Sequence, residues 1–183
     1  SDYERLTGQY MRTHFEHRRN PCWACRLGHV VMMKIKVGPY TGLECEEPEY
    51  ELVAGLGTQI GVNDTEAVMM LANSVDRLGI DGNESGWLIG WIMECYEKGI
   101  LTKNDLDGLE MRWGDPEAVK QMLHKIAHRN GCGNKFAEGV KRASEQTGPE
   151  AAKMGVYTMK GAAPRGHDHR GQNRWVELFD TCV

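Results

Sequence analysis

The spacing of apolar residues along the chain predicts a mostly helical protein. In most segments apolar residues recur every three or four positions, the period of a helix with one buried face. In the helix expected at 86–98, apolar side chains nearly surround the axis, so we expect it to lie deep in the core. The β-branched run at 30–37 (VVMMKIKV) predicts one short strand. The expected helices cover residues 3–19, 49–56, 65–78, 86–98, 116–129, 135–146 and 149–153.

Local signals at the ends of these segments indicate their boundaries. Asp64 and Asp115 are good N-caps for the helices that follow them, and Gly79 is expected to end the first of the two. Either Asn83 or Ser85 is expected to start the helix at 86–98. Residues 41–50 are expected to form an acidic connector.

The helical spacing of apolar residues ends after Tyr157. Residues 160–171 (KGAAPRGHDHRG) form a loop without a period, and long loops of this kind are usually functional. A new element is expected to begin at Asn173. We therefore expect a helical domain at 1–159, then at 160–183 a loop and the start of a truncated following domain. The expected fold is mainly α, an orthogonal multi-helix domain with one short β piece, in a fragment of a longer chain.

Charge and composition narrow the class of protein. The chain has 22 basic and 26 acidic residues, and a net charge of −4 argues against a general nucleic-acid binder. No run approaches the roughly 18 apolar residues of a membrane span, and no basic-then-apolar leader is present. We expect a cytoplasmic protein. Six cysteines in 183 residues are too few for a disulfide scaffold.

Cys22, Cys25 and His29 follow the spacing C-x2-C-x3-H. Two thiolates at this distance suit a metal or a redox disulfide. A redox motif is disfavoured because no βαβ pattern surrounds the pair. Iron–sulfur clusters and zinc both accept cysteine and histidine, so the spacing favours a metal without choosing it. The alternative is a pair of buried thiols.

Cys45 lies in a run of glutamates, Glu44, Glu46, Glu47, Glu49 and Glu51. Nearby negative charge raises the pKa of a thiol and makes it a poor nucleophile. A bound metal reverses this logic because a coordinating thiol loses its proton. Taken alone, Cys45 reads as an ordinary surface or boundary thiol.

Two further groups carry candidate chemistry. His167 and His169 flank Asp168 in the 160–171 loop and could act as general acid and base groups or metal ligands. Asp76 and Asp81 bracket a glycine turn, where their carboxylates could accept hydrogen bonds from the N–H groups of a heterocycle.

Several stretches, taken in order, resemble the tungsten-containing aldehyde ferredoxin oxidoreductase family. The C-x2-C-x3-H run matches the cysteine run of the family, with histidine in the third place. The stretch at 47–51 (EPEYE) is similar to its E-G-P-E-Y-E stretch, and 76–81 (DRLGID) is similar to its pterin-binding motif. Further similar stretches lie at 101–115, 129–133, 136–143, 160–161 and 168–170.

The resemblance implies the helical middle domain of a larger multidomain oxidoreductase and the first residues of its third domain. It also implies two cofactors, a tungsten bis-pyranopterin (tungstopterin) and a [4Fe-4S] cluster. Cys22, Cys25 and His29 would hold cluster iron. The pterin would be held by the segment that contains Asp76, Arg77, Leu78, Gly79 and Asp81.

The resemblance also implies where protons are handled. Glu51, with Tyr50, would face the metal as a proton-handling group. His167 or His169 could deliver further protons to the substrate.

Two features resemble one branch, the class II benzoyl-CoA reductases, which reduce the aromatic ring of a CoA thioester. His29 stands in the third cluster position, and Cys45 precedes the EPEYE stretch. In that branch a protein cysteine can bind the tungsten, and Cys45 is the candidate here.

We therefore expect reduction of an aromatic acyl-CoA, with ferredoxin or an electron-transfer iron–sulfur subunit as the partner. Oxidation of aldehydes to carboxylic acids is the alternative with the same cofactors. An alternative of another class is a non-catalytic, zinc-binding helical module. No nucleic acid and no membrane span are expected.

Overall fold

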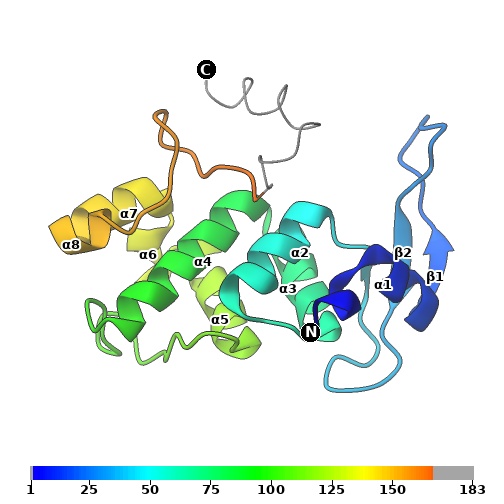
Figure 1. The fold of residues 1–183 in the computed structure, drawn as a ribbon, viewed down its shortest axis with the longest axis horizontal. Coiled ribbons are helices and arrows are strands. Elements are labelled where there is room, and N and C mark those ends of the chain that lie inside the picture. The colour runs from blue at the N-terminus through cyan, green and yellow to red at the C-terminus, as the bar shows by residue number, and fades with distance from the viewer. Residues whose placement is uncertain (1, 167–183) are drawn as a thin grey trace.

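Helices are the main regular elements of the computed structural model, which describes residues 2–166 (Figure 1). The prediction of a mainly α fold with a small β part is confirmed. Five predicted helices are present within four residues of their expected ends, as α2, α3, α4, α5 and α8. The helical elements are η1 Asp2–Leu6, α1 Gly8–His14, α2 Tyr50–Leu56, η2 Thr58–Ile60, α3 Thr65–Leu78, α4 Gly82–Glu97, α5 Pro116–Ala127, α6 Gly133–Phe136, α7 Gly139–Thr147 and α8 Pro149–Ala152.

A three-stranded antiparallel sheet of order β1-β2-β3 lies at one end of the helices. Its strands are β1 Glu16–Arg19, β2 Val31–Lys34 and β3 Glu44–Glu46. Only β2 was expected. Residues 16–19 were predicted as the end of a helix and 44–46 as a connector, and both predictions are wrong. All four residues of β1 are exposed, so no apolar alternation signals the strand, which forms by pairing with β2.

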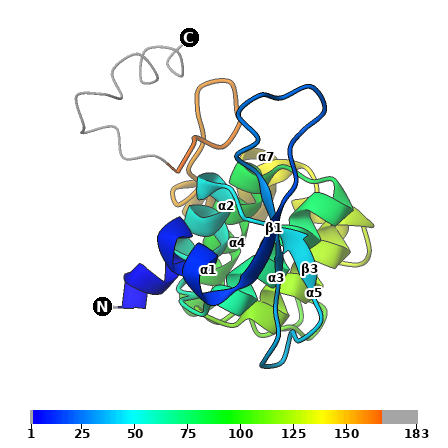
Figure 2. The ribbon, with the colours of Figure 1, turned by 90° about the vertical axis from the view of Figure 1, so that its right-hand side faces the viewer.

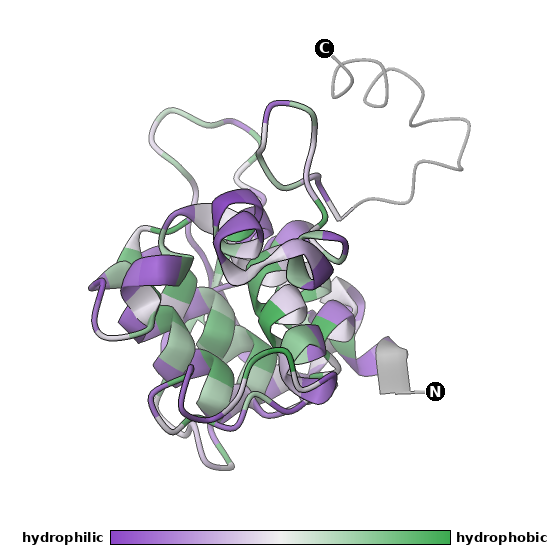
Figure 3. Ribbon diagram, turned by 90° about the vertical axis from the view of Figure 1, so that its left-hand side faces the viewer, coloured by the Kyte–Doolittle hydropathy of each residue, from purple (hydrophilic) through white to green (hydrophobic). Residues whose placement is uncertain are grey.

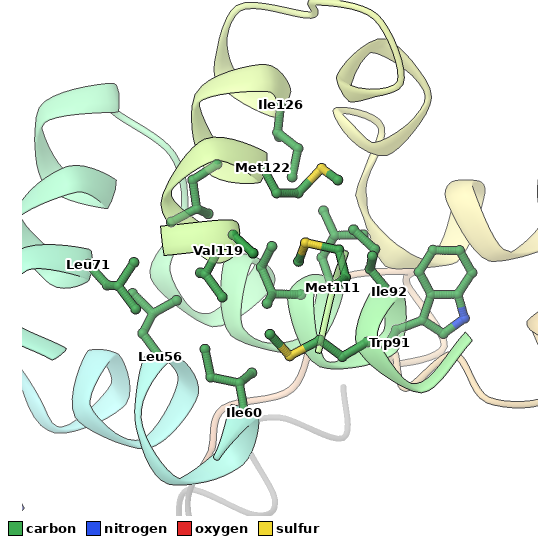
Figure 4. Close-up of a cluster of buried hydrophobic side chains, with 14 of the residues drawn as sticks. Leu56, Ile60, Leu71, Trp91, Ile92, Met111, Val119, Met122 and Ile126 are labelled. Carbon is green, nitrogen blue, oxygen red and sulfur yellow. The ribbon is translucent and has the colours of Figure 1, made fainter. Parts of the chain in front are cut away.

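The main hydrophobic core lies where α2, α3, α4 and α5 meet (Figure 4). Leu56, Leu71, Ile92 and Val119 come from these four helices in turn, and each is fully buried. Figure 3 shows that the polar residues gather on the outer faces of the helices. Every residue of α4 from 88 to 93 is buried, which confirms that this helix lies deep in the core.

Two glycines allow α2 and α4 to approach closely. A Cβ added to Gly86 would lie 2.6 Å from the Cα of Gly55, well inside van der Waals contact. Larger residues at either position would separate the two helices. The contact therefore sets the spacing between α2, which follows the acidic strand β3, and α4, which follows the predicted pterin segment.

The ends of α3 and α4 meet at the turn that holds the predicted pterin segment. Gly79 adopts the left-handed conformation and ends α3 as predicted. Its N–H donates to Asp76 O and the N–H of Ile80 donates to Val75 O, the Schellman pattern. The next helix begins earlier than predicted, because Asp81 rather than Asn83 or Ser85 is its N-cap.

The single helix predicted at 135–146 is two helices, α6 and α7. The first ends at Phe136 and the second begins at Gly139, whose φ of 84° lies in the left-handed region and lets the chain turn between them. Among residues 2–166, none of the helices combines the length and the apolar character required to cross a bilayer.

The loop between β1 and β2 projects away from the helices in Figures 1 and 2. Residues 158–166 form the other prominent loop and contain no helix or strand. The described residues therefore include most of the predicted domain at 1–159 but only seven residues of the predicted 160–183 unit. The element expected from Asn173 lies outside the described residues.

Candidate functional site

A hollow of about 450 Å³ lies between β3, the start of α2 and the C-terminal end of α3. We call it the acidic hollow because carboxylates dominate its wall. It exists because α3 packs against β3, which brings two distant parts of the sequence together. Its lining residues are Met32, Glu44, Cys45, Glu46, Glu47, Glu49, Leu52, Asn73, Asp76 and Arg77.

Cys45 is the central residue of β3 and is only 2% exposed. The alternation of the strand points its neighbours Glu44 and Glu46 to solvent and Cys45 to the interior. There it packs in a small cluster that includes Met11, Met33 and Met69. The interpretation of Cys45 as a surface or boundary thiol is therefore wrong.

Burial, together with the negative charges of Asp76 and Glu46, raises the pKa of the Cys45 thiol to about 11. This agrees with the expectation that the surrounding acids would make Cys45 a poor free nucleophile. At neutral pH the side chain is a protonated, electron-rich sulfur at the edge of the hollow. A thiophilic metal would have to displace that proton on binding.

Most glutamates of the hollow are held by partners outside it. Glu47 accepts a bidentate pair of hydrogen bonds from Arg12, with 2.9 Å between Arg12 Nε and Glu47 Oε1. Glu44 pairs with Lys34 at 2.9 Å. These contacts fix the rim and neutralise part of its charge.

Asp76 differs from the glutamates. Within residues 2–166 its carboxylate has no hydrogen-bond or ion-pair partner. It lies in the last turn of α3, where the helix dipole disfavours an acid. Partial burial, and secondly the charge of Glu46, raise its pKa. An unpaired acid at an unfavourable helix end is typical of a group that binds a ligand rather than one that stabilises the fold.

The other residues of the predicted pterin segment have different roles, and most of them stabilise the fold. Asp81 is exposed, but one of its oxygens caps α4 by accepting the N–H of Glu84 at 2.7 Å. Arg77 lines the acidic hollow and donates from Nε to Asn73 Oδ1 at 3.4 Å. Leu78 packs against the main core, and Gly79 forms the turn. Only Asp76 and Arg77 of the segment line the hollow.

Cys22, Cys25 and His29 lie together on the projecting loop but do not line the acidic hollow. Cys22 is exposed and Cys25 is partly buried, and the Cys25 N–H donates to Cys22 O at 3.0 Å. Residues 2–166 contain no group of three or more His, Cys, Asp or Glu side chains placed to hold a metal ion. The assignment of these three residues to a cluster therefore stays a prediction.

The base of the projecting loop nevertheless touches the hollow. His29 Nε2 lies 3.8 Å from Glu49 Oε1, and Asn20 donates to Glu46 Oε1 at 2.9 Å. Two rim glutamates thus connect the loop that carries the cysteines with the wall that carries Asp76.

The predicted proton-handling residues lie near the start of α2 or outside the described residues. Tyr50 is 53% exposed, and its hydroxyl donates to Gly166 O at 3.3 Å. Glu51 is partly buried in the first turn of the same helix. His167 and His169 lie outside the described residues, so their roles stay predictions.

Sequence reasoning missed two residues near the site. Asn73 lines the hollow one helical turn before Asp76, a position that helical spacing alone would have indicated. Glu84 binds two distant backbone groups, and the D-x-x-E pattern that it forms with Asp81 was the available signal.

Comparison with known proteins decides the family. The family model described as "Aldehyde ferredoxin oxidoreductase, domains 2 & 3" matches residues 1–178. This chain belongs to that family. The resemblance found in the sequence is thereby confirmed.

Curated relatives support the same family. The chain is 38% identical over 165 residues to an "Aliphatic sulfonate oxidoreductase, WOR-like subunit" of Pyrococcus furiosus, covering 88% of this chain and 26% of the relative. It is 36% identical over 168 residues to the "Tungsten-containing aldehyde ferredoxin oxidoreductase" of the same organism, covering 90% and 27%. The chain thus spans about a quarter of the length of these relatives.

A solved structure shares the fold. The active site complex BamBC of benzoyl coenzyme A reductase, with 1,5-dienoyl-CoA, matches with a TM-score of 0.68 at 21% identity. The match covers 86% of this chain and 23% of that one. At this identity the likeness shows the fold.

Two residues of the acidic hollow carry donor groups that a tungstopterin could use. Cys45 offers a soft sulfur ligand for the metal. Asp76 offers a carboxylate, without a partner in the described part of the chain, that could accept hydrogen bonds from pterin N–H groups. The residues of this wall therefore fit the cofactor.

Proposed function

We propose that this chain is the cofactor-binding part of a tungstopterin, iron–sulfur oxidoreductase that reduces the aromatic ring of an aromatic acyl-CoA. The family membership supports the cofactor. The observation that carries the proposal is the acidic hollow, where a buried thiol and a carboxylate from distant segments share one wall. Cys45 would hold the metal and Asp76 would hold the pterin.

The proposed reaction adds two electrons and two protons to the ring of benzoyl-CoA to give a cyclic dienoyl-CoA. The electrons would come from a low-potential carrier, either a ferredoxin or an iron–sulfur subunit. When bound, the tungstopterin supplies the redox chemistry. The protein must then keep water out and provide protons at defined atoms.

The chain provides candidate residues for both tasks. Leu52 and Met32 contribute apolar surface to the wall of the hollow and would keep water from that side of a bound cofactor. Glu51 lies in the first turn of α2, and its carboxylate would accept and release protons there. The Tyr50 hydroxyl, which binds Gly166 O, is placed to hold the backbone beside it.

A second candidate is aldehyde oxidation, in which an aldehyde and water give a carboxylic acid, two protons and two electrons. The curated relatives favour it, because those named as tungsten-containing aldehyde ferredoxin oxidoreductases are 31–36% identical to this chain. Both candidates use the same cofactors. Cys45 in the hollow is the feature that favours the acyl-CoA reaction.

Assays on the full-length protein purified without oxygen test the proposal. We expect tungsten, iron and sulfide in the preparation, a brown colour and an EPR signal from a reduced cluster. Turnover of benzoyl-CoA with a low-potential donor, without oxidation of aldehydes by viologen dyes, supports the first candidate, and the reverse supports the second. A colourless protein that contains zinc alone would contradict both.

A further inference from the structure

We propose that Glu84 is a positioning residue that fixes the backbone segment 158–166 to the end of α4 that also carries Asp81. Glu84 lies in the first turn of α4 and is partly buried. Neither the sequence motifs nor the comparisons give this residue a role. Its two carboxylate oxygens each bind a different part of the chain.

One oxygen holds the start of α7. Glu84 Oε1 accepts the N–H of Val140 at 2.6 Å. Gly139 makes this approach possible, because a Cβ there would lie 2.8 Å from the same oxygen. An N–H at a helix start has no partner within its helix, and the carboxylate supplies one.

The other oxygen holds the loop. Glu84 Oε2 accepts the N–H of Ala163 at 2.9 Å. Hydrogen bonds from backbone N–H to an ionised carboxylate are stronger than neutral ones. A single ionised side chain thus joins three segments: α4, α7 and the loop.

Two further contacts extend this attachment along the loop. Trp87, one turn later on α4, donates from Nε1 to Pro164 O at 2.7 Å. Tyr50 on α2 donates to Gly166 O at 3.3 Å. The loop is therefore held at residues 163, 164 and 166 by side chains of α4 and α2, the two helices that pack at Gly55 and Gly86.

The attachment connects Asp81, at the start of α4, with the loop that ends at Gly166. The backbone N–H of Glu84 donates to Asp81 Oδ1 at 2.7 Å, and its side chain binds the loop. Glu84 therefore contacts both Asp81, in the predicted pterin segment, and the loop. Gly166 immediately precedes His167 in the sequence. We infer that Glu84 sets the position of Gly166, the last described residue of the loop, relative to Asp81. This part of the inference rests on the proposed function.

The test compares Glu84→Gln with Glu97→Gln in the full-length protein. Glu97 is exposed near the other end of the same helix and serves as the matched control. In Glu84→Gln one carboxylate oxygen becomes an NH₂ group, which cannot accept a hydrogen bond. We expect amide hydrogen exchange in peptides covering 158–166 to accelerate about tenfold or more, corresponding to loss of about 1.4 kcal/mol of local protection. Glu97→Gln should match the wild type.

A kinetic readout separates positioning from general stability. If the protein carries out either proposed reaction, kcat of Glu84→Gln should fall about tenfold or more while KM and tungsten content change less than about twofold. Glu84→Asp keeps the charge but shortens the reach, and should give an intermediate rate of exchange. If Glu84→Gln does not fold, Glu84→Asp alone decides.

Unchanged exchange at 158–166 in the variants would overturn the inference, whatever the activity. Faster exchange in a protein without tungsten or turnover would leave the attachment supported and contradict only the proposed function.

Discussion

Cys45 and Asp76 line the same hollow, although one belongs to a strand and the other to the last turn of a helix. The charge of Asp76 contributes to the raised pKa of Cys45, which shows that the two groups are electrostatically coupled. Packing of α3 on β3 produces this relationship. The proposed cofactor site depends on it.

Asp81 caps α4, and the family resemblance separately predicts that it binds the pterin. Asp81→Asn keeps a good N-cap and removes the charge, whereas Asp81→Ala removes both. We expect Asp81→Ala to lower the free energy of unfolding by about 1 kcal/mol and Asp81→Asn to change it much less. Denaturant unfolding of the 183-residue chain measures this difference.

The pterin content of the same variants in the full-length protein tests the second task. Both should bind less pterin than the wild type. A wild-type pterin content in Asp81→Asn would show that the charge of Asp81 is not used by the cofactor.

The close contact between α2 and α4 predicts that glycine-to-alanine substitutions at Gly86 and Gly90 of α4 have opposite effects on stability. Gly86→Ala would place a methyl group 2.6 Å from Gly55 Cα, and we expect a loss of about 1–3 kcal/mol from overpacking. Gly90→Ala meets no atom closer than 3.8 Å and should stabilise the helix by up to about 1 kcal/mol. Thermal unfolding of the two variants checks the sign, and equal effects would argue against this helix packing.

Asp107 predicts a dependence of stability on pH. It accepts hydrogen bonds from Lys125 Nζ at 2.9 Å and from the Cys132 N–H at 2.8 Å, and these contacts lower its pKa to about 2. Because the pKa is lower in the folded state, the contribution of Asp107 is present above its ordinary pKa near 4. It is lost as the pH falls towards 2.

Comparison of the wild type with Asp107→Asn measures that contribution. The wild type should be more stable at pH 7, and the difference should shrink between about pH 4 and pH 2. A difference that stays constant over this range would mean that the Asp107 charge is not responsible.

The fold could be predicted where local signals decide it. Helix α3 has the predicted bounds because Asp64 caps its start and Gly79 forms the left-handed turn at its end. Strands β1 and β3 were missed because their conformation comes from pairing with β2, a contact between residues far apart in the sequence. The start of α4 was missed because a turn of polar residues offers several possible caps, and only the structure shows that Asp81 accepts the Glu84 N–H.

In the candidate site too, local sequence signals predicted some features, whereas others depend on contacts between distant parts of the chain. The run of glutamates was enough to predict a raised pKa for Cys45. The largest cause of that shift is burial, which results from the alternation of β3 and the packing of α3, and neither is visible in the sequence. The likeness of the 76–81 stretch to a pterin motif singled out Asp76. That its carboxylate has no partner within residues 2–166 emerged only from the structure.

The coordination of tungsten in the full-length protein tests the central claim most directly. X-ray absorption should be compared between the wild type, Cys45→Ser and Cys95→Ser, a control at another buried thiol of the core. If the acidic hollow faces the metal, Cys45→Ser should lose one sulfur neighbour of tungsten and Cys95→Ser none. A tungsten-loaded Cys45→Ser protein with the wild-type sulfur count would contradict the assignment of the hollow to the cofactor.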